Sequence, residues 1–106
     1  MNSESLNKLV IMALEEMKGV DITLLDVRDR CTFTDFMVVA SGTSDRHVKS
    51  LAQKVVERAK ESGEPPLGIE DSRGSGWVLV DLVDVVVHVM RPDVREFYNL
   101  EKLWAV

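Results

Sequence analysis

The side chains best suited to metal binding or nucleophilic catalysis are few and widely spaced. The two histidines are His47 and His88, and the single cysteine is Cys31. Zinc sites draw their histidine and cysteine ligands from short, regular spacings, and neither HExxH nor CxxC occurs here. A cysteine nucleophile needs a base and an activating environment, and the sequence around Cys31 carries no such signature. We therefore expect no metal site and no catalytic cysteine.

The turn Ser41-Gly42-Thr43-Ser44 is a second candidate for chemistry, because it joins an apolar segment to a predicted helix. Backbone N–H groups at a helix N-terminus can hold a phosphate. Nucleotidyltransferases place a Gly-Ser turn there and add two carboxylates that hold metal ions. The nearest carboxylate pair, Asp81 and Asp84, straddles a predicted turn and is not expected to converge. A turn with a helix cap accounts for Gly42–Ser44, and a nucleotide-binding enzyme is the alternative.

The elements that would position these groups are organised around the stretch Gly76–Met90. Its β-branched residues predict a hairpin of two strands, Trp77–Asp81 and Val85–Met90. The connecting residues Leu82-Val83-Asp84 lack Gly and Asn, so a two-residue primed turn is not expected.

Side chains alternate along these strands and give the hairpin two different faces. One face is aliphatic: Val78, Val80, Leu82, Val85, Val87 and Val89. The other is mixed: Trp77, Leu79, Asp81, Val86, His88 and Met90. We expect the aliphatic face to lie against the core. The mixed face could meet solvent, another chain or a second, partly polar core layer.

The remaining pattern predicts a single α/β (α+β) domain over residues 1–106. Apolar stripes and caps predict helices at residues 3–18, 45–62 and from Pro92 onward, with Gly19 in the left-handed position after the first and Gly63 ending the second. Further strands are expected at residues 21–27, 36–40 and 67–70, the last at a sheet edge. The order α-β-β-α-β-β-β-α favours a mixed five-stranded sheet with helices mainly on one face.

The charge distribution and composition limit the kinds of molecule that the protein is expected to bind. The net charge is −5, and residues 64–93 hold six acidic and two basic residues. This distribution argues against an RNA-binding module, which needs basic and aromatic side chains together, but it suits a basic protein partner. The alternative is that these acids serve solubility. The lone cysteine suits a reducing cytoplasm, and neither a signal peptide nor a membrane span is expected.

A binding surface fits the mixed face better than a catalytic site does. Aromatic residues dominate the centres of protein interfaces, and charged residues occupy their rims. The candidate centre is Trp77, His88, Met90 and Tyr98, and the candidate rim is Glu70, Asp71, Asp81 and Asp84. The alternative is that Trp77 and Tyr98 are core residues whose polar ends are satisfied.

Four segments resemble the ribosomal silencing factor family, also called RsfS, YbeB or Iojap. They are GTSDRHVKSLA at Gly42–Ala52, PLGIE at Pro66–Glu70, WVLVDLVDVVVHVM at Trp77–Met90 and REFYNLEKLW at Arg95–Trp104. The resemblance covers nearly the whole chain in order and with matching spacing.

The resemblance implies a nucleotidyltransferase-like fold without the catalytic carboxylates, and so no enzymatic activity and no cofactor. It implies binding to the fourteenth protein of the large ribosomal subunit at the intersubunit face. Occupying that face blocks joining of the small subunit and represses translation when nutrients fall. Members of the family also form homodimers. The partner surface is expected on the mixed face and its rim.

Overall fold

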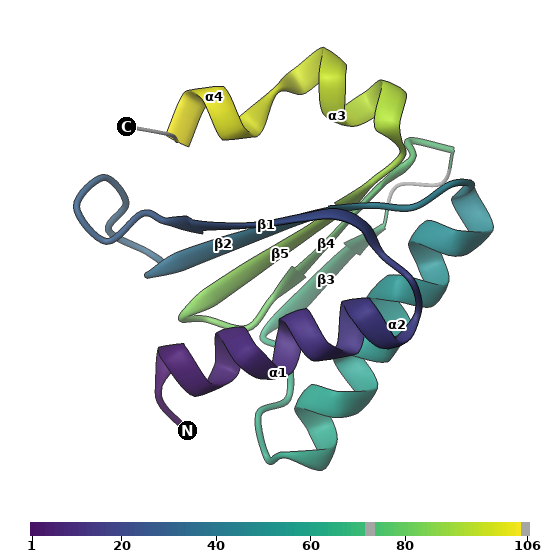
Figure 1. Ribbon diagram of the computed structural model, residues 1–106. Helices are drawn as coiled ribbons and strands as arrows, with labels where there is room; N and C mark the ends of the chain where they lie inside the picture. Colours follow the sequence, from purple (N-terminus) through teal and green to yellow (C-terminus); the bar gives the residue numbers. More distant parts are fainter. Residues whose placement is uncertain (72–73, 105–106) are drawn as a thin grey trace.

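The computed structural model describes residues 1–71 and 74–104; Ser72 and Arg73, in the polar loop before the hairpin, lie outside this range. Two long helices lie on one side of a central sheet and two short helices on the other (Figure 1). The elements are α1 Ser3–Glu16, β1 Val20–Asp26, β2 Phe36–Ser41, α2 Asp45–Glu61, β3 Gly68–Asp71, β4 Trp77–Asp81, β5 Val85–Met90, α3 Pro92–Tyr98 and α4 Leu100–Trp104.

The five strands form an open mixed sheet in the order β1-β2-β5-β4-β3. β2 and β5 pair in parallel, and the other three pairings are antiparallel. The predicted hairpin is present as β4 and β5, with Trp77 opposite Met90 and Asp81 opposite Val86. The short β3 is an edge strand, as predicted, and the fold class is confirmed.

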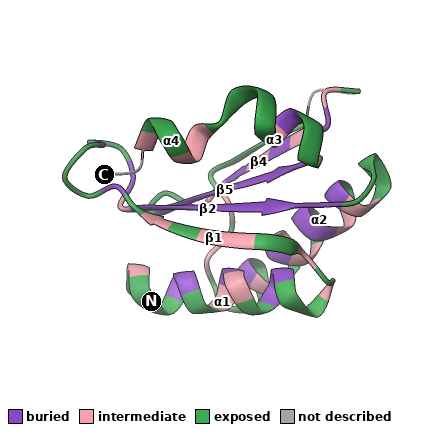
Figure 2. Ribbon diagram, turned by 45° about the horizontal axis from the view of Figure 1, so that its top comes forward, coloured by how far each residue is buried: buried purple, intermediate pink, exposed green. Residues whose placement is uncertain are grey.

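The main core lies between the aliphatic face of the sheet and helices α1 and α2. All six aliphatic residues predicted from the hairpin are buried there. From the helices, the apolar stripes contribute fully buried side chains such as Leu14, Leu51 and Val55. Because β2 and β5 lie at the centre of the sheet, both strands are buried along their whole length (Figure 2).

The helix ends follow the predicted caps with one exception. The Asn2 side chain accepts from the N–H of Ser5, and Gly63 has a φ of 76°. The expectation for Gly19 was wrong, because Lys18 takes the left-handed position with a φ of 60°. A Cβ on Gly19 would meet the Leu14 carbonyl oxygen at 3.1 Å, so Gly19 is suited to close packing.

The C-terminal segment forms two short helices and not the single predicted one. Asn99, with a φ of 47°, ends α3 and redirects the chain into α4. Asparagine tolerates this left-handed conformation better than most residues. Both helices lie over the mixed face, opposite α1 and α2 (Figure 1). Among the described residues, no helix is both long and apolar enough to cross a membrane.

The turn between β4 and β5 holds an unusual backbone conformation. Val83 has a φ of 71°, although a β-branched side chain disfavours that region. Two hydrogen bonds hold it: Asp81 Oδ1 accepts from the N–H of Val83 at 2.8 Å, and the N–H of Asp84 donates to the Leu82 carbonyl at 2.9 Å. The Asp81 carboxylate therefore has a structural role in the turn.

Candidate functional site

The mixed face is the side of the sheet turned away from α1 and α2, and its residues align across all five strands. One row of paired residues is Thr23, Val39, His88, Leu79 and Glu70. The row runs from buried apolar and polar groups at the centre to an exposed carboxylate at the β3 edge. Along this one row of paired residues, the mixed face is therefore buried at the centre of the sheet and exposed to solvent at the β3 edge.

The open part is built around Trp77, which contacts two other rings. Its ring centroid lies 4.9 Å from that of Tyr98 on α3 and 5.8 Å from that of His88 on β5. Phe97 meets Tyr98 edge to face at 5.0 Å. Phe97 is 81% exposed and Tyr98 54% exposed, so the aromatic series runs from the sheet to the surface. We call Trp77, Phe97 and Tyr98 the aromatic cluster.

His88 anchors the aromatic cluster from below. Trp77 Nε1–H donates to His88 Nδ1 at 3.2 Å, so that ring nitrogen carries no proton. The neutral imidazole then has its proton on Nε2, which is buried without a hydrogen-bond partner among the described residues. Burial lowers the pKa of His88 from 6.5 to about 4, because the charged ring would lose its hydration. His88 is therefore neutral at physiological pH.

Arg95 holds α3 and α4 to the sheet. Its guanidinium donates to Ser41 Oγ at 2.9 Å, to Thr23 Oγ1 at 3.1 Å and to Glu101 Oε1 at 2.6 Å. The Arg95 side chain is only 12% exposed. Since these partners lie on β2, β1 and α4, one side chain fixes the position of the helix that carries Tyr98.

A small apolar layer fills the rest of the space under α4. Val27, Cys31, Met37 and Val86 form a second buried cluster, and Trp104 packs against it. Trp104 at the end of α4 therefore docks on its own domain. Cys31 is a buried member of this layer. The mixed face is thus a second core layer at one end and a solvent-facing surface at the other.

The eight predicted binding residues do not share one environment. Exposed residues are Glu70, Asp71, Asp84 and Tyr98; half-buried residues are Trp77 and Asp81; buried residues are His88 and Met90. Met90 has no exposed surface, so it can only support the residues above it. The structure brings Trp77, His88 and Tyr98 into contact.

The turn before α2 is occupied by its own side chains. Ser44 Oγ accepts from the N–H of His47, and His47 Nδ1 accepts from the N–H of Thr43 at 2.9 Å. Asp45 adds a negative charge at the same helix end and pairs with Arg91. A Cβ on Gly42 would lie 2.8 Å from the backbone nitrogen of Val48. The N–H groups of Thr43 and His47 are therefore already used, and Asp45 adds a negative charge, so the helix N-terminus is poorly suited to a phosphate.

No described cluster of histidine, cysteine or carboxylate side chains has the makeup of a metal site. His47 is committed to a structural role, since its Nε2 lies 2.8 Å from the Met17 carbonyl oxygen. That contact links the start of α2 to the end of α1. Asp81 is engaged in its turn, while Asp84 is exposed beyond it.

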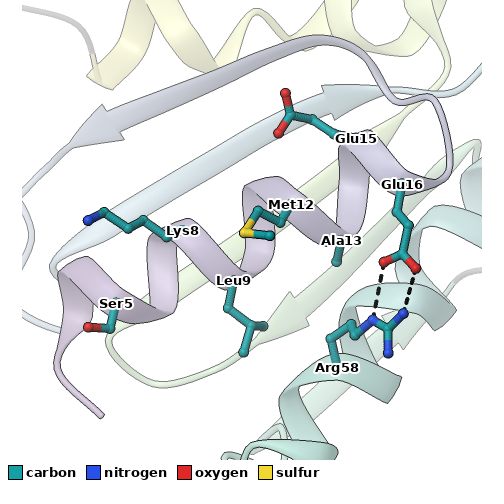
Figure 3. Close-up of a pocket in the computed structure, with 8 residues that line it drawn as sticks. All are labelled: Ser5, Lys8, Leu9, Met12, Ala13, Glu15, Glu16 and Arg58. Carbon is teal, nitrogen blue, oxygen red and sulfur yellow. Dashed lines mark hydrogen bonds and ion pairs between the residues drawn. The ribbon is translucent and has the colours of Figure 1, made fainter.

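A separate groove lies between α1 and α2, on the far side of the sheet from the aromatic cluster. Leu9, Met12 and Ala13 give it an apolar lining, and its volume is about 820 Å³ (Figure 3). Glu16 and Arg58 form a two-contact ion pair at one end of the groove (Figure 3). The arginine lowers the pKa of the Glu16 carboxyl by hydrogen bonding. The polar side chains that line the groove are exposed except for Arg58, which is paired with Glu16, so they do not form a site suited to catalysis.

Sequence reasoning missed two contributors to the open surface. Phe97 was not among the predicted binding residues, yet its side chain is exposed and meets the Tyr98 ring edge to face. Arg95 was also not among the predicted site residues, although it begins the segment Arg95–Trp104 that resembles the family. The sequence feature that could have identified it is its position next to the apolar Val94, because an arginine near a packed side chain must either reach solvent or find polar partners.

Taken together, fold and site define a small open-sheet α/β domain with an aromatic and acidic surface. A family model described as "Ribosomal silencing factor during starvation" matches residues 1–106. The chain belongs to this ribosomal silencing factor family, which confirms the resemblance read from the motifs. Membership supports a ribosome-associated role in the silencing of translation, and the family is a regulatory and not a known enzymatic one.

Individual relatives agree with the family match. The ribosomal silencing factor of Chromobacterium violaceum is 46% identical over 99% of this chain and 86% of the relative. A crystal structure of a protein from the same organism covers 98% of this chain and 87% of its own, with a TM-score of 0.95 and 46% identity. The mouse protein "Mitochondrial assembly of ribosomal large subunit protein 1" is 33% identical over 92% of this chain and 44% of its own length.

Proposed function

We propose that this protein binds the fourteenth protein of the large ribosomal subunit through the open part of the mixed face. Bound there, at the surface where the subunits meet, it prevents the small subunit from joining and represses translation when nutrients are limiting. The large subunit is also the one named in the mouse relative. Neither a cofactor nor a catalytic residue is required by this mechanism.

The aromatic cluster is the observation that carries the proposal. Phe97 and Tyr98 are large exposed rings beside Trp77, which is itself half-buried. Exposed aromatic side chains held rigidly at a surface are typical of interface centres. Glu70 on β3 provides an acidic rim beside them. Such a rim favours a basic partner and mainly raises the association rate. The expectation that Asp71 belongs to this rim was wrong, because Asp71 pairs with Val78 and so lies on the opposite face of the sheet, beside α2.

The size of the domain is sufficient for a steric mechanism. Its extents are 32 × 31 × 21 Å. A specific interface of typical size covers about 800 Å² per partner. A body more than 20 Å thick, held by such an interface, leaves no room for a second large particle at the same place. Inhibition therefore follows from occupancy and needs no chemical step.

Two sedimentation experiments test this. The protein should co-migrate with isolated large subunits, and adding it to large subunits before small subunits should reduce the 70S peak. Isolated fourteenth protein should bind directly, and the aromatic-cluster variant Tyr98→Ala should bind less. Protein that stays at the top of the gradient, or that co-migrates without reducing joining, would contradict the proposal.

The nucleotide alternative and self-association can be measured on the same material. Calorimetry with ATP or CTP and Mg²⁺ should give no binding heat, because the turn before α2 is filled by Ser44 and His47. Sedimentation equilibrium should detect the homodimer that the family resemblance implies. If the partner and the second copy use the same surface, added ribosomal protein will dissociate the dimer.

A further inference from the structure

A hollow beside the aromatic cluster has the chemistry of a side-chain binding site. It is lined by Glu70, Ser75, Trp77, Leu79 and Tyr98, with a volume of about 380 Å³. Ligand sites typically range from about 300 to 1,000 Å³, so this hollow suits a small group. We propose that it receives an arginine side chain of a protein partner. The inference rests on the proposed function only in assigning that arginine to the ribosomal partner.

The polar groups of the hollow define what it can bind. Ser75 is already used, because its hydroxyl donates to the Trp77 carbonyl and accepts from the Trp77 N–H. The indole N–H of Trp77 is donated to His88. Among the described residues, the Glu70 carboxylate and the Tyr98 hydroxyl have no side-chain hydrogen bond or ion pair, so they remain available. The carboxylate can only accept hydrogen bonds at neutral pH, so the hollow selects a donor.

The rings select a cation over a neutral donor. Trp77 and Tyr98 meet at 51° with centroids 4.9 Å apart, which gives the hollow two π surfaces. A guanidinium is attracted to such faces, and it can also form two parallel hydrogen bonds with a carboxylate. Leu79 supplies an apolar contact for the methylene groups of the same side chain. None of the five lining residues is basic, so nothing among them competes for Glu70.

The register of the sheet places these groups side by side. Glu70 pairs directly with Leu79, and Leu79 with His88, so all three lie on the mixed face. Trp77 lies two residues before Leu79 on the same side of β4, and α3 brings Tyr98 over it. Carboxylate, apolar contact and rings therefore come from three elements, and the hollow exists only when α3 is docked.

An NMR titration with small probes tests the proposal without the ribosome. The probe is N-acetyl-arginine methylamide, and the matched control is N-acetyl-citrulline methylamide, which has a neutral urea of similar shape. The arginine probe should shift the indole signal of Trp77 saturably and bind about fivefold more tightly than the citrulline probe. Trp104, on the other part of the face, provides an internal reference that should not shift.

Two variants assign the selectivity to the hollow. Glu70→Gln should remove most of the preference for arginine, and Tyr98→Leu should weaken the arginine probe while leaving the fold intact. Glu15→Gln on α1, which is exposed and lies on the far side of the sheet, should change nothing. Equal binding of citrulline, tighter binding of N-acetyl-lysine methylamide or an unchanged preference in Glu70→Gln would overturn the proposal.

The outcome is separable from the proposed function. If Glu70→Gln loses the arginine preference but the unchanged protein fails to co-sediment with large subunits, the hollow stands and the ribosomal partner is wrong. If the protein co-sediments but the probes bind without selectivity, the partner stands and the arginine site is wrong.

Discussion

Trp77 and His88 form one hydrogen-bonded pair that crosses the boundary between surface and core. The indole N–H donates to Nδ1 of the imidazole at 3.2 Å, while His88 is only 6% exposed. A protonated imidazole would carry a hydrogen on Nδ1 and lose this bond. The orientation of the central ring of the aromatic cluster is therefore coupled to the charge state of His88.

Stability should fall in acid because His88 must then be protonated in the unfolded chain. The folded pKa is about 4 and the unfolded value is 6.5, so between these pH values only the unfolded chain binds the proton. The stability that the neutral His88 provides, expressed as free energy of unfolding, is fully present above pH 6.5 and is lost as the pH falls toward 4. It amounts to roughly 3 kcal/mol at most. Urea unfolding at pH 7, 6, 5 and 4 measures it.

The His88→Gln variant is the control for this measurement. A glutamine oxygen can accept from Trp77, but the side chain does not titrate. The variant should show a shallower fall of stability between pH 6.5 and pH 4. Parallel curves for the two proteins would mean that His88 is not the group responsible.

Replacing Arg95 should loosen α3 and α4 while the sheet persists. Arg95→Ala leaves Ser41, Thr23 and Glu101 without their guanidinium partner, at a cost of about 2 to 3 kcal/mol. Hydrogen exchange should become faster in residues 92–104 than in β2 and β5. Arg95→Lys should be intermediate, since an ammonium group cannot reach all three partners in the same geometry. If exchange became faster to the same extent throughout the protein in both variants, Arg95 would not be holding α3 and α4 to the sheet locally.

Tyr98 should matter for binding more than for folding. The side chain is 54% exposed, so Tyr98→Ala should change the free energy of unfolding by no more than about 1 kcal/mol. Binding to the large subunit should weaken by about 2 kcal/mol, as for an aromatic interface residue. Phe33→Ala is the matched control, since Phe33 is 67% exposed and lies in the loop before β2. An equal loss in both variants would place the partner elsewhere.

Charge reversal at Asp84 should slow association. Asp84 is exposed, and its side chain has no hydrogen bond or ion pair with a described residue, whereas Asp81 holds the Val83 turn. Asp84→Lys therefore tests charge without disturbing the turn. The association rate should fall at low ionic strength and approach that of the unchanged protein in high salt. A rate that does not depend on salt in either protein would remove Asp84 from the rim.

Gly42 should tolerate no side chain, in contrast to Gly68. The Cβ of Gly42→Ala would lie 2.8 Å from the Val48 backbone nitrogen, so the start of α2 must move. We expect a loss of about 1 to 3 kcal/mol in denaturant unfolding. A Cβ on Gly68 meets nothing within 4 Å, so Gly68→Ala should be nearly neutral. Equal effects would show that the crowding at Gly42 relaxes freely.

The sequence was most informative where one element carries the whole signal. The alternation in β4 and β5 identified the six aliphatic residues that the structure buries against α1 and α2. The helix stripes and the Ser44 cap are also local patterns, because their periods follow from backbone geometry. The same local segments were sufficient for the family resemblance. Sequence alone therefore determined the fold class and the family.

Only the tertiary structure decided how the mixed face is divided. Arg95 reaches Ser41 across 54 positions and Thr23 across 72, and no local periodicity encodes such contacts. These bonds place α3 and α4 over the mixed face, on the opposite side from α1 and α2. As a result His88 and Met90 are closed in, while Tyr98 stands exposed beside Trp77. Alternation fixes which side chains share a face, but the docking of a distant helix fixes which of them a partner can reach.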